Sequence, residues 1–165
     1  MRKLVLITLL ALGASYNLAM AATISNYERQ IIASCLVLEA ASDGIEGMRA
    51  VLNVIYNRAH HRLERVVREA IKRGQFSSMH SIWGKRNPDY SPILRRAQRD
   101  KMYASAVKLV LLMERGRLYD NTQGSTYYCT VEGENPYWVN HFYYITTIGS
   151  HKFYSDRRHP SFTNR

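Results

Sequence analysis

Cysteine is scarce in this sequence: Cys35 and Cys129 are the two cysteines among 165 residues. Two cysteines are too few for the disulfide scaffold on which many small secreted domains depend. The sequence leaves two alternatives for this pair, a single Cys35–Cys129 bridge or two buried free thiols. The fold must therefore be stabilised mainly by a hydrophobic core rather than by a disulfide framework.

Hydrophobic runs are too short to span a membrane. The run from Leu4 to Leu12 has about nine residues, whereas a membrane-spanning helix needs about 20. It follows the basic pair Arg2-Lys3 and precedes Ala19-Met20-Ala21, whose small residues suit a signal peptidase. We therefore expect residues 1–21 to be a signal peptide that is cleaved near Ala21. The mature protein would be exported to the periplasm, the cell wall or the medium; a retained membrane anchor is the alternative.

Acidic residues are also scarce, with 13 Asp and Glu against 23 Lys and Arg, which gives a formal net charge of +10. Such a surface favours a polyanionic partner. An exported protein meets anionic envelope polymers, so we expect these as partners and do not expect nucleic acid. A basic protein that is merely kept soluble by its charge is the alternative. The 46% hydrophobic and 22% charged residues are typical of a folded chain. We expect residues 22–165 to form one domain and a monomer.

Several chemical motifs are missing. The six histidines lack HExxH or another paired-ligand spacing, so the sequence predicts no metal site. No glycine-rich loop stands between a strand and a helix, as a phosphate-binding loop would. Cys129 follows two tyrosines, and the sequence fixes no partner histidine for it as a nucleophile. We therefore expect neither a metal nor a cofactor.

The most informative residue is Glu39. Ser25 and Glu28 form a capping-box pattern that predicts a helix start. Ile31, Cys35 and Glu39 follow at intervals of four residues, which places Glu39 in the last turn on the core-facing side. Loss of water and the negative end of the helix dipole both favour a protonated carboxyl, the form that a general acid needs. Alternatively, Glu39 borders the apolar stripe and pairs with an arginine.

Further helices follow along the chain. Asp43 and Glu46 form a second cap pattern, which predicts a helix that buries Met48, Val51, Leu52 and Ile55. A third helix is expected from Leu63 to Arg73, with Gly74 as its stop. Residues 75–91 are interpreted as a long loop, and Ser91-Pro92 as the start of a helix towards Arg115 and Gly116.

The C-terminal part is of a different character, because residues 122–131 and 143–154 are rich in Thr, Tyr and β-branched residues. Short strands or loops fit this composition. Asp120 is interpreted as a turn residue rather than a catalytic base. The predicted architecture is therefore mainly α (α+β), with a short aromatic-rich β or irregular C-terminal portion. Clustered tyrosines suit a sugar-binding groove, with core packing as the alternative.

Several segments, in order, resemble motifs of the SleB-type cell wall hydrolase family, which includes spore-cortex-lytic enzymes. They are Glu39-Ala40-Ala41-Ser42-Asp43, the stretch from Gly47 to Arg58 with its terminal Asn57-Arg58, Gly74-Gln75-Phe76-Ser77, the stretch from Asp120 to Tyr128, Pro136-Tyr137-Trp138, and the stretch from Ile148 to Tyr154. The family has Arg-Gly where this chain has Ala41-Ser42, and Glu where it has Asp43. These departures leave substrate preference and activity level open.

The resemblance implies a lysozyme-like fold of the goose-type lytic transglycosylase kind. It implies cleavage of peptidoglycan glycan strands between N-acetylmuramic acid and N-acetylglucosamine, with Glu39 as the general acid. The residues that this resemblance places along the sugar groove are Gln75, Phe76, Ser77, Thr126, Tyr127, Tyr128 and Trp138. Because a lytic transglycosylase needs a single carboxylate, it fits a sequence that offers one well-placed acid. The alternative is a peptidoglycan-binding protein that keeps the fold without turnover.

Overall fold

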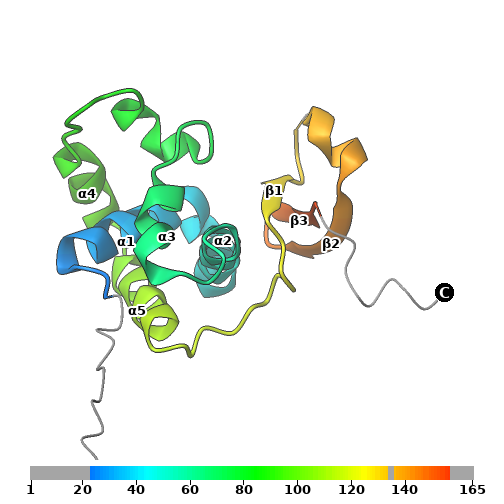
Figure 1. Cartoon of the computed structure of the whole chain (residues 1–165), viewed down its shortest axis with the longest axis horizontal. Helices are drawn as coiled ribbons and strands as arrows, with labels where there is room; N and C mark the ends of the chain where they lie inside the picture. The colour runs from blue at the N-terminus through cyan, green and yellow to red at the C-terminus, as the bar shows by residue number, and fades with distance from the viewer. Residues whose placement is uncertain (1–22, 134–135, 157–165) are drawn as a thin grey trace, which may run out of the picture.

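The computed structural model describes residues 23–133 and 136–156 (Figure 1). The predicted signal peptide lies outside these residues. The helical elements are α1 (Asn26–Ala40), η1 (Ala41–Asp43), α2 (Gly44–Arg58), α3 (Leu63–Ala70), η2 (Ser77–Ile82), α4 (Ser91–Gln98), α5 (Tyr103–Glu114) and η3 (Tyr137–His141). The strands are β1 (Tyr127–Thr130), β2 (Tyr143–Ile148) and β3 (His151–Ser155). Among the described residues, no helix is long and apolar enough to cross a membrane.

Helix α1 is the centre of the helical part and contacts α2, α3, α4 and α5. The predicted capping box is present, since Ser25 Oγ accepts the Glu28 amide at 3.2 Å and a Glu28 carboxylate oxygen accepts the Ser25 amide at 2.9 Å. The predicted single buried stripe is too narrow, because Ser34 and Val37 are buried as well. Helices that pack around α1 cover most of its circumference, which a stripe pattern cannot indicate.

Helix α2 buries the predicted inner face, and Met48, Val51, Leu52 and Ile55 are 0% exposed. The prediction that Asp43 and Glu46 form its cap is wrong, since no side chain caps this helix. The Asp43 carboxylate instead bonds to Ser150 and His151, and Glu46 pairs with Arg49 at 3.3 Å. For Asp43, long-range partners have replaced the local cap, and sequence spacing gives no information about them.

The segment that follows α3 differs from the prediction in two ways. Residues 75–91 contain the 3₁₀ helix η2 rather than only a loop. The single helix expected from Ser91 to Arg115 is divided into α4 and α5. At this break Asp100 Oδ1 accepts the Met102 amide at 2.8 Å, a local turn that competes with helix continuation. Gly116 has a φ of +63° and ends α5 as predicted.

The predicted C-terminal strands form a three-stranded antiparallel sheet in the order β1-β3-β2. Figure 1 shows this sheet beside the helices, next to α2. Phe153 of β3 is 0% exposed and packs with Ala50 and Val54 of α2, which joins the sheet to the helical part. Cys35 in α1 and Cys129 in β1 are both free thiols, so the structure excludes the bridge; of the two thiols expected to be buried, Cys35 is buried and Cys129 is half-buried.

Candidate active site

Glu39 lies where the helical part meets the sheet. Its Oε1 accepts the backbone N–H of Ser78 in η2 at 2.9 Å, and its Oε2 accepts the hydroxyl of Tyr128 in β1 at 3.0 Å. The side chain is half-buried in the last turn of α1, as its spacing predicted. Within the described part of the chain, no arginine or lysine forms an ion pair with it. The carboxylate is therefore held in place by two neutral donors from separate elements.

Tyr128 is the side-chain donor to this carboxylate. Burial raises the pKa of its hydroxyl well above the ordinary tyrosine value, and the nearby Glu39 charge raises this pKa further. The phenol is thus a neutral hydrogen-bond donor at neutral pH. Its ring packs edge-on against His151, with ring centres 5.0 Å apart, and lies 5.7 Å from the ring of Phe153. These contacts fix the direction from which the hydroxyl reaches Glu39.

Cys35 lies one helical turn before Glu39 and is 0% exposed. Burial raises the pKa of its thiol well above the usual range, and the Glu39 charge raises this pKa further. Its Sγ is 3.9 Å from the carbonyl oxygen of Ala70. A buried neutral thiol is a poor nucleophile, so Cys35 supports the site by packing.

Asp43, Ser150 and His151 form a hydrogen-bonded group that we call the Asp43 clamp. The Asp43 carboxylate accepts the Ser150 amide at 3.0 Å and the Ser150 hydroxyl at 2.9 Å, and its Oδ2 is 2.7 Å from His151 Nδ1. The side chains of Asp43 and His151 are 8% and 7% exposed. Burial raises the pKa of Asp43, but hydrogen bonds from Ser150 and His151 outweigh this effect and hold that pKa below its usual value.

The clamp joins the corner after α1 to the turn between β2 and β3. Asp43 thus holds the start of β3, and His151 of that strand packs against the ring of Tyr128 in β1, which donates to Glu39. A Cβ on Gly47 or on Gly149 would overlap the Asp43 side chain. Both glycines are therefore required for the close approach of Asp43 to the sheet.

The remaining acids considered in the sequence have structural partners. Asp120 is a turn residue as predicted: its Oδ1 accepts the Thr122 amide at 2.8 Å, and its Oδ2 accepts the Gly124 amide at 2.8 Å. Glu46 accepts a hydrogen bond from the Asn121 side chain at 3.2 Å. Asp43, Glu46 and Asp120 are thus each engaged away from Glu39. The described residues also contain no group of three or more His, Cys, Asp or Glu side chains that could hold a metal ion.

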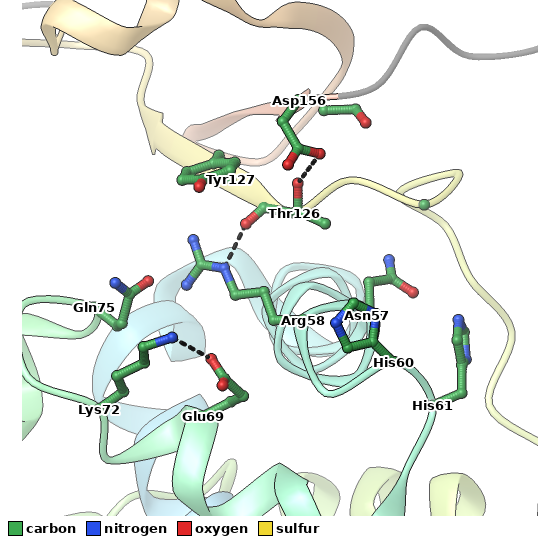
Figure 2. A pocket seen from close by; sticks show the side chains of 12 residues that line it. Asn57, Arg58, His60, His61, Glu69, Lys72, Gln75, Thr126, Tyr127 and Asp156 are labelled. Carbon is green, nitrogen blue, oxygen red and sulfur yellow. Dashed lines mark hydrogen bonds and ion pairs between the residues drawn. The ribbon is translucent and has the colours of Figure 1, made fainter.

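A cavity of about 550 Å³ opens between the end of α2, α3 and β1 (Figure 2). Gln75, Thr126 and Tyr127 line it, but Glu39 does not. Gln75 is three residues before Ser78, so even an extended chain places their Cα atoms within roughly 11 Å of each other. The cavity is thus close to the carboxylate. Further lining side chains, which the sequence analysis did not assign to a site, include those of Asn57, Arg58, His60, His61, Glu69 and Lys72.

The other residues expected along the sugar groove lie in different environments in the structure. Phe76 is 0% exposed, so the prediction that it contacts a sugar is wrong; it packs beneath the site as a core residue. Ser77 is exposed at the start of η2. Tyr127 lies on the sheet face opposite Tyr128, and its ring is 5.4 Å from that of half-buried Trp138. Successive side chains of a strand point to opposite faces of the sheet, so the sequence already indicated that Tyr127 and Tyr128 lie on different faces.

A family model described as Cell Wall Hydrolase matches residues 42–154. No curated protein sequence matches the chain significantly. Among solved structures, the chain is similar to the catalytic domain of the germination-specific lytic transglycosylase SleB from Bacillus anthracis. The two are 22% identical, the match covers 80% of this chain and 97% of that chain, and the TM-score is 0.59. This likeness confirms the predicted fold class. Because the family model matches more than half of the sequence, the chain belongs to the cell wall hydrolase family, as its motifs indicated.

Proposed function

We propose that this protein degrades peptidoglycan by cleaving the glycosidic bond between N-acetylmuramic acid and N-acetylglucosamine, with Glu39 as general acid and base. Family membership supports the degradation of cell wall material. The observation that carries the assignment of Glu39 is its half-buried carboxylate, held by the Ser78 amide and the Tyr128 hydroxyl at the junction of helices and sheet. A positioned carboxyl of this kind is what proton transfer to a leaving-group oxygen requires.

In the proposed reaction Glu39 first donates its proton to the glycosidic oxygen, and the bond from that oxygen to C1 of the muramyl sugar breaks. The resulting carboxylate then takes the proton of the C6 hydroxyl of the same sugar. O6 bonds to C1, which gives a 1,6-anhydro sugar and returns Glu39 to its protonated form. One carboxyl group therefore serves both steps.

The structure supports a mechanism with a single carboxylate. A hydrolase of the usual kind places two carboxyl groups on either side of the bond. Here Asp43 is bound to Ser150 and His151, and Asp120 is bound within its own turn. Neither is positioned as a partner for Glu39. The lytic transglycosylase reaction is therefore the form that we favour.

The proposed glycan groove includes Gln75, Ser77, Thr126, Tyr127 and Trp138, with Tyr128 acting through Glu39. We further propose that the protein is exported and acts as a monomer on the wall. The exposed basic residues before, in and after α3 would bind anionic envelope polymers; they are Arg62, Arg68, Lys72 and Arg73.

The test is a product analysis. Purified protein is incubated with peptidoglycan sacculi, and the soluble fragments are weighed by mass spectrometry. We expect anhydro products from the wild type and from Glu132→Gln, which changes an exposed acid. Glu39→Gln should lower the rate by about 10²–10⁴-fold, the usual contribution of general acid–base catalysis. Reducing-end products would show a hydrolase, and equal rates for Glu39→Gln and wild type would refute the assignment of Glu39.

A binding protein without turnover is the second candidate. The observation in its favour is that the family match begins at residue 42, three residues after Glu39, where Ala41 and Ser42 replace the Arg-Gly of the family motif. This candidate predicts that wild type and Glu39→Gln bind sacculi equally and that neither releases a fragment. The same incubation, with the bound fraction measured by pelleting, distinguishes the two candidates.

A further inference from the structure

Arg58, at the end of α2, is a cationic side chain that the proposed reaction does not use. Its Nε donates to the carbonyl oxygen of Thr126, and its guanidinium carbon lies 5.0 Å from the ring centre of Tyr127 and 5.9 Å from that of Phe76. One terminal nitrogen, Nη1, is buried and has no hydrogen-bond partner among the described residues. Figure 2 shows the guanidinium group in the cavity, between Thr126 and Tyr127 on one side and Lys72 and Glu69 on the other.

No carboxylate in the described ranges forms an ion pair with Arg58. Burial lowers the pKa of its guanidinium, while the neighbouring Tyr127, Tyr128 and Glu69 raise it. Arginine nevertheless stays protonated in proteins. A charge that is removed from water without a partner costs free energy unless a ligand supplies the opposite charge.

Neither of the two acids at the cavity forms an ion pair with Arg58. Glu69 lies 3.4 Å from Lys72 and forms an ion pair with it. Asp156 is on the opposite side, where its Oδ1 accepts the Thr126 hydroxyl at 3.4 Å. Arg58 lines the cavity, so the part of its guanidinium group that faces the cavity is available to an external anion, and a charged N–H donor there suits a carboxylate.

We propose that this cavity binds the stem peptide of the wall glycan, with Arg58 holding a peptide carboxylate and with Gln75, Thr126 and Tyr127 shared between the glycan and its peptide. The proposal rests on the proposed function. Because Gln75 lines the cavity and lies within roughly 11 Å of Ser78, a sugar at Glu39 and a peptide in the cavity can belong to one substrate molecule. A lining that contains both acids and bases also suits a peptide with ammonium and carboxylate groups.

The test measures binding with catalysis removed. Glu39→Gln protein is titrated with soluble glycan fragments that carry intact stem peptides, and with the same fragments after an amidase has removed the peptides. We expect the peptide-bearing fragments to bind about tenfold more tightly, since a hydrogen bond to a charged group contributes about 1.5–3 kcal/mol. Adding Arg58→Met, which keeps an apolar stem against Tyr127, should abolish this difference. Arg96→Gln removes an exposed charge in α4, outside the cavity, and should preserve it.

Equal binding of the two fragments by Glu39→Gln protein would overturn the proposal. If Arg58→Met weakens the binding of both fragments equally, the proposal is also overturned, because that result indicates a structural role for Arg58. If Arg58→Met does not fold, the Arg58 side-chain N–H resonances of Glu39→Gln protein are followed by NMR instead. They should shift with peptide-bearing fragments alone, and an unchanged spectrum refutes the proposal. Preferential binding by a wild type that cleaves neither fragment would show that the proposed reaction has failed while the peptide site stands.

Discussion

At the scale of single residues, the site depends on how neutral donors surround Glu39. The Ser78 amide is fixed by the backbone of η2, whereas the Tyr128 hydroxyl depends on the packing of β1 against the helices. The ring of Tyr128 contacts His151 and Phe153, so sheet packing sets the direction of its O–H bond. Tyr128 is thus a positioning residue for the proposed acid.

Replacing Tyr128 by Phe removes this hydroxyl and keeps the ring. If Glu39 is the acid, we expect kcat on sacculi to fall by about 10–100-fold with KM little changed, because the lost hydrogen bond is worth about 1.5–3 kcal/mol. Tyr137→Phe is the matched control, since Tyr137 is 84% exposed. Steady-state kinetics checks the prediction, and an unchanged kcat in Tyr128→Phe would contradict it.

Asp43 gives a prediction for stability and pH. Because its pKa is lowered in the folded state, that state binds this proton less readily than the unfolded chain does. The resulting stabilisation is present above about pH 4, the ordinary Asp value, and is lost as the pH falls through the lower folded pKa. Asp43→Asn should reduce the free energy of unfolding at pH 7 by about 1–3 kcal/mol. The difference from wild type should shrink towards pH 3.

Urea unfolding at several pH values between 7 and 3 measures this effect. Glu132→Gln serves as the control, because it changes an exposed acid and should track the wild type at each pH. A difference between Asp43→Asn and wild type that stays constant over the whole range would show that the clamp is not the source of the pH dependence.

At the scale of elements, two glycines permit the contact between the α1–α2 corner and the β2–β3 turn. Gly149 has a φ of +57°, and a Cβ there would overlap Asp43. Gly149→Ala should therefore destabilise the fold by about 2–4 kcal/mol, through backbone strain and steric overlap together. Gly116 has a φ of +63° but no atom within 4 Å of an added Cβ. Gly116→Ala should lower the free energy of unfolding by only about 1 kcal/mol, because it introduces backbone strain without steric overlap.

Calorimetric melting of the two alanine variants tests this comparison, because both carry the backbone penalty and only one carries the overlap. Equal melting temperatures would mean that Asp43 moves aside without cost and that the clamp does not hold the sheet. A lower melting temperature for Gly149→Ala is expected. Its activity should fall as well, since the same turn positions His151 against Tyr128.

Helix existence was easier to predict than helix ends. The start of α1 was predictable because its cap lies within residues 25–28, and the end of α5 because Gly116 adopts a positive φ. The break between α4 and α5 was missed, because Asp100 makes a local turn inside a sequence of good helix formers. The cap assigned to Asp43 was wrong because its partner, Ser150, is 107 residues away.

At the scale of the whole molecule, the net charge of +10 should dominate the first association with an anionic wall. Binding of Glu39→Gln protein to sacculi should weaken by at least about tenfold between 50 and 500 mM salt, because added ions screen exposed charges. Replacing Arg65 and Arg68 of α3 by Gln should reduce this dependence. Pelleting assays measure both effects, and salt-independent binding would contradict a role for the basic surface.

The sequence by itself determined the mainly helical class, the aromatic strands and the place of Glu39 in the last turn of α1, because each follows from short-range periodicity and composition. Only the tertiary structure decided what surrounds Glu39. Tyr128 is 89 residues from it in sequence, and Arg58 meets Thr126 across 68 residues. The packing of the helices against the sheet determines these contacts, and local sequence patterns do not predict that packing. The same packing buried Phe76.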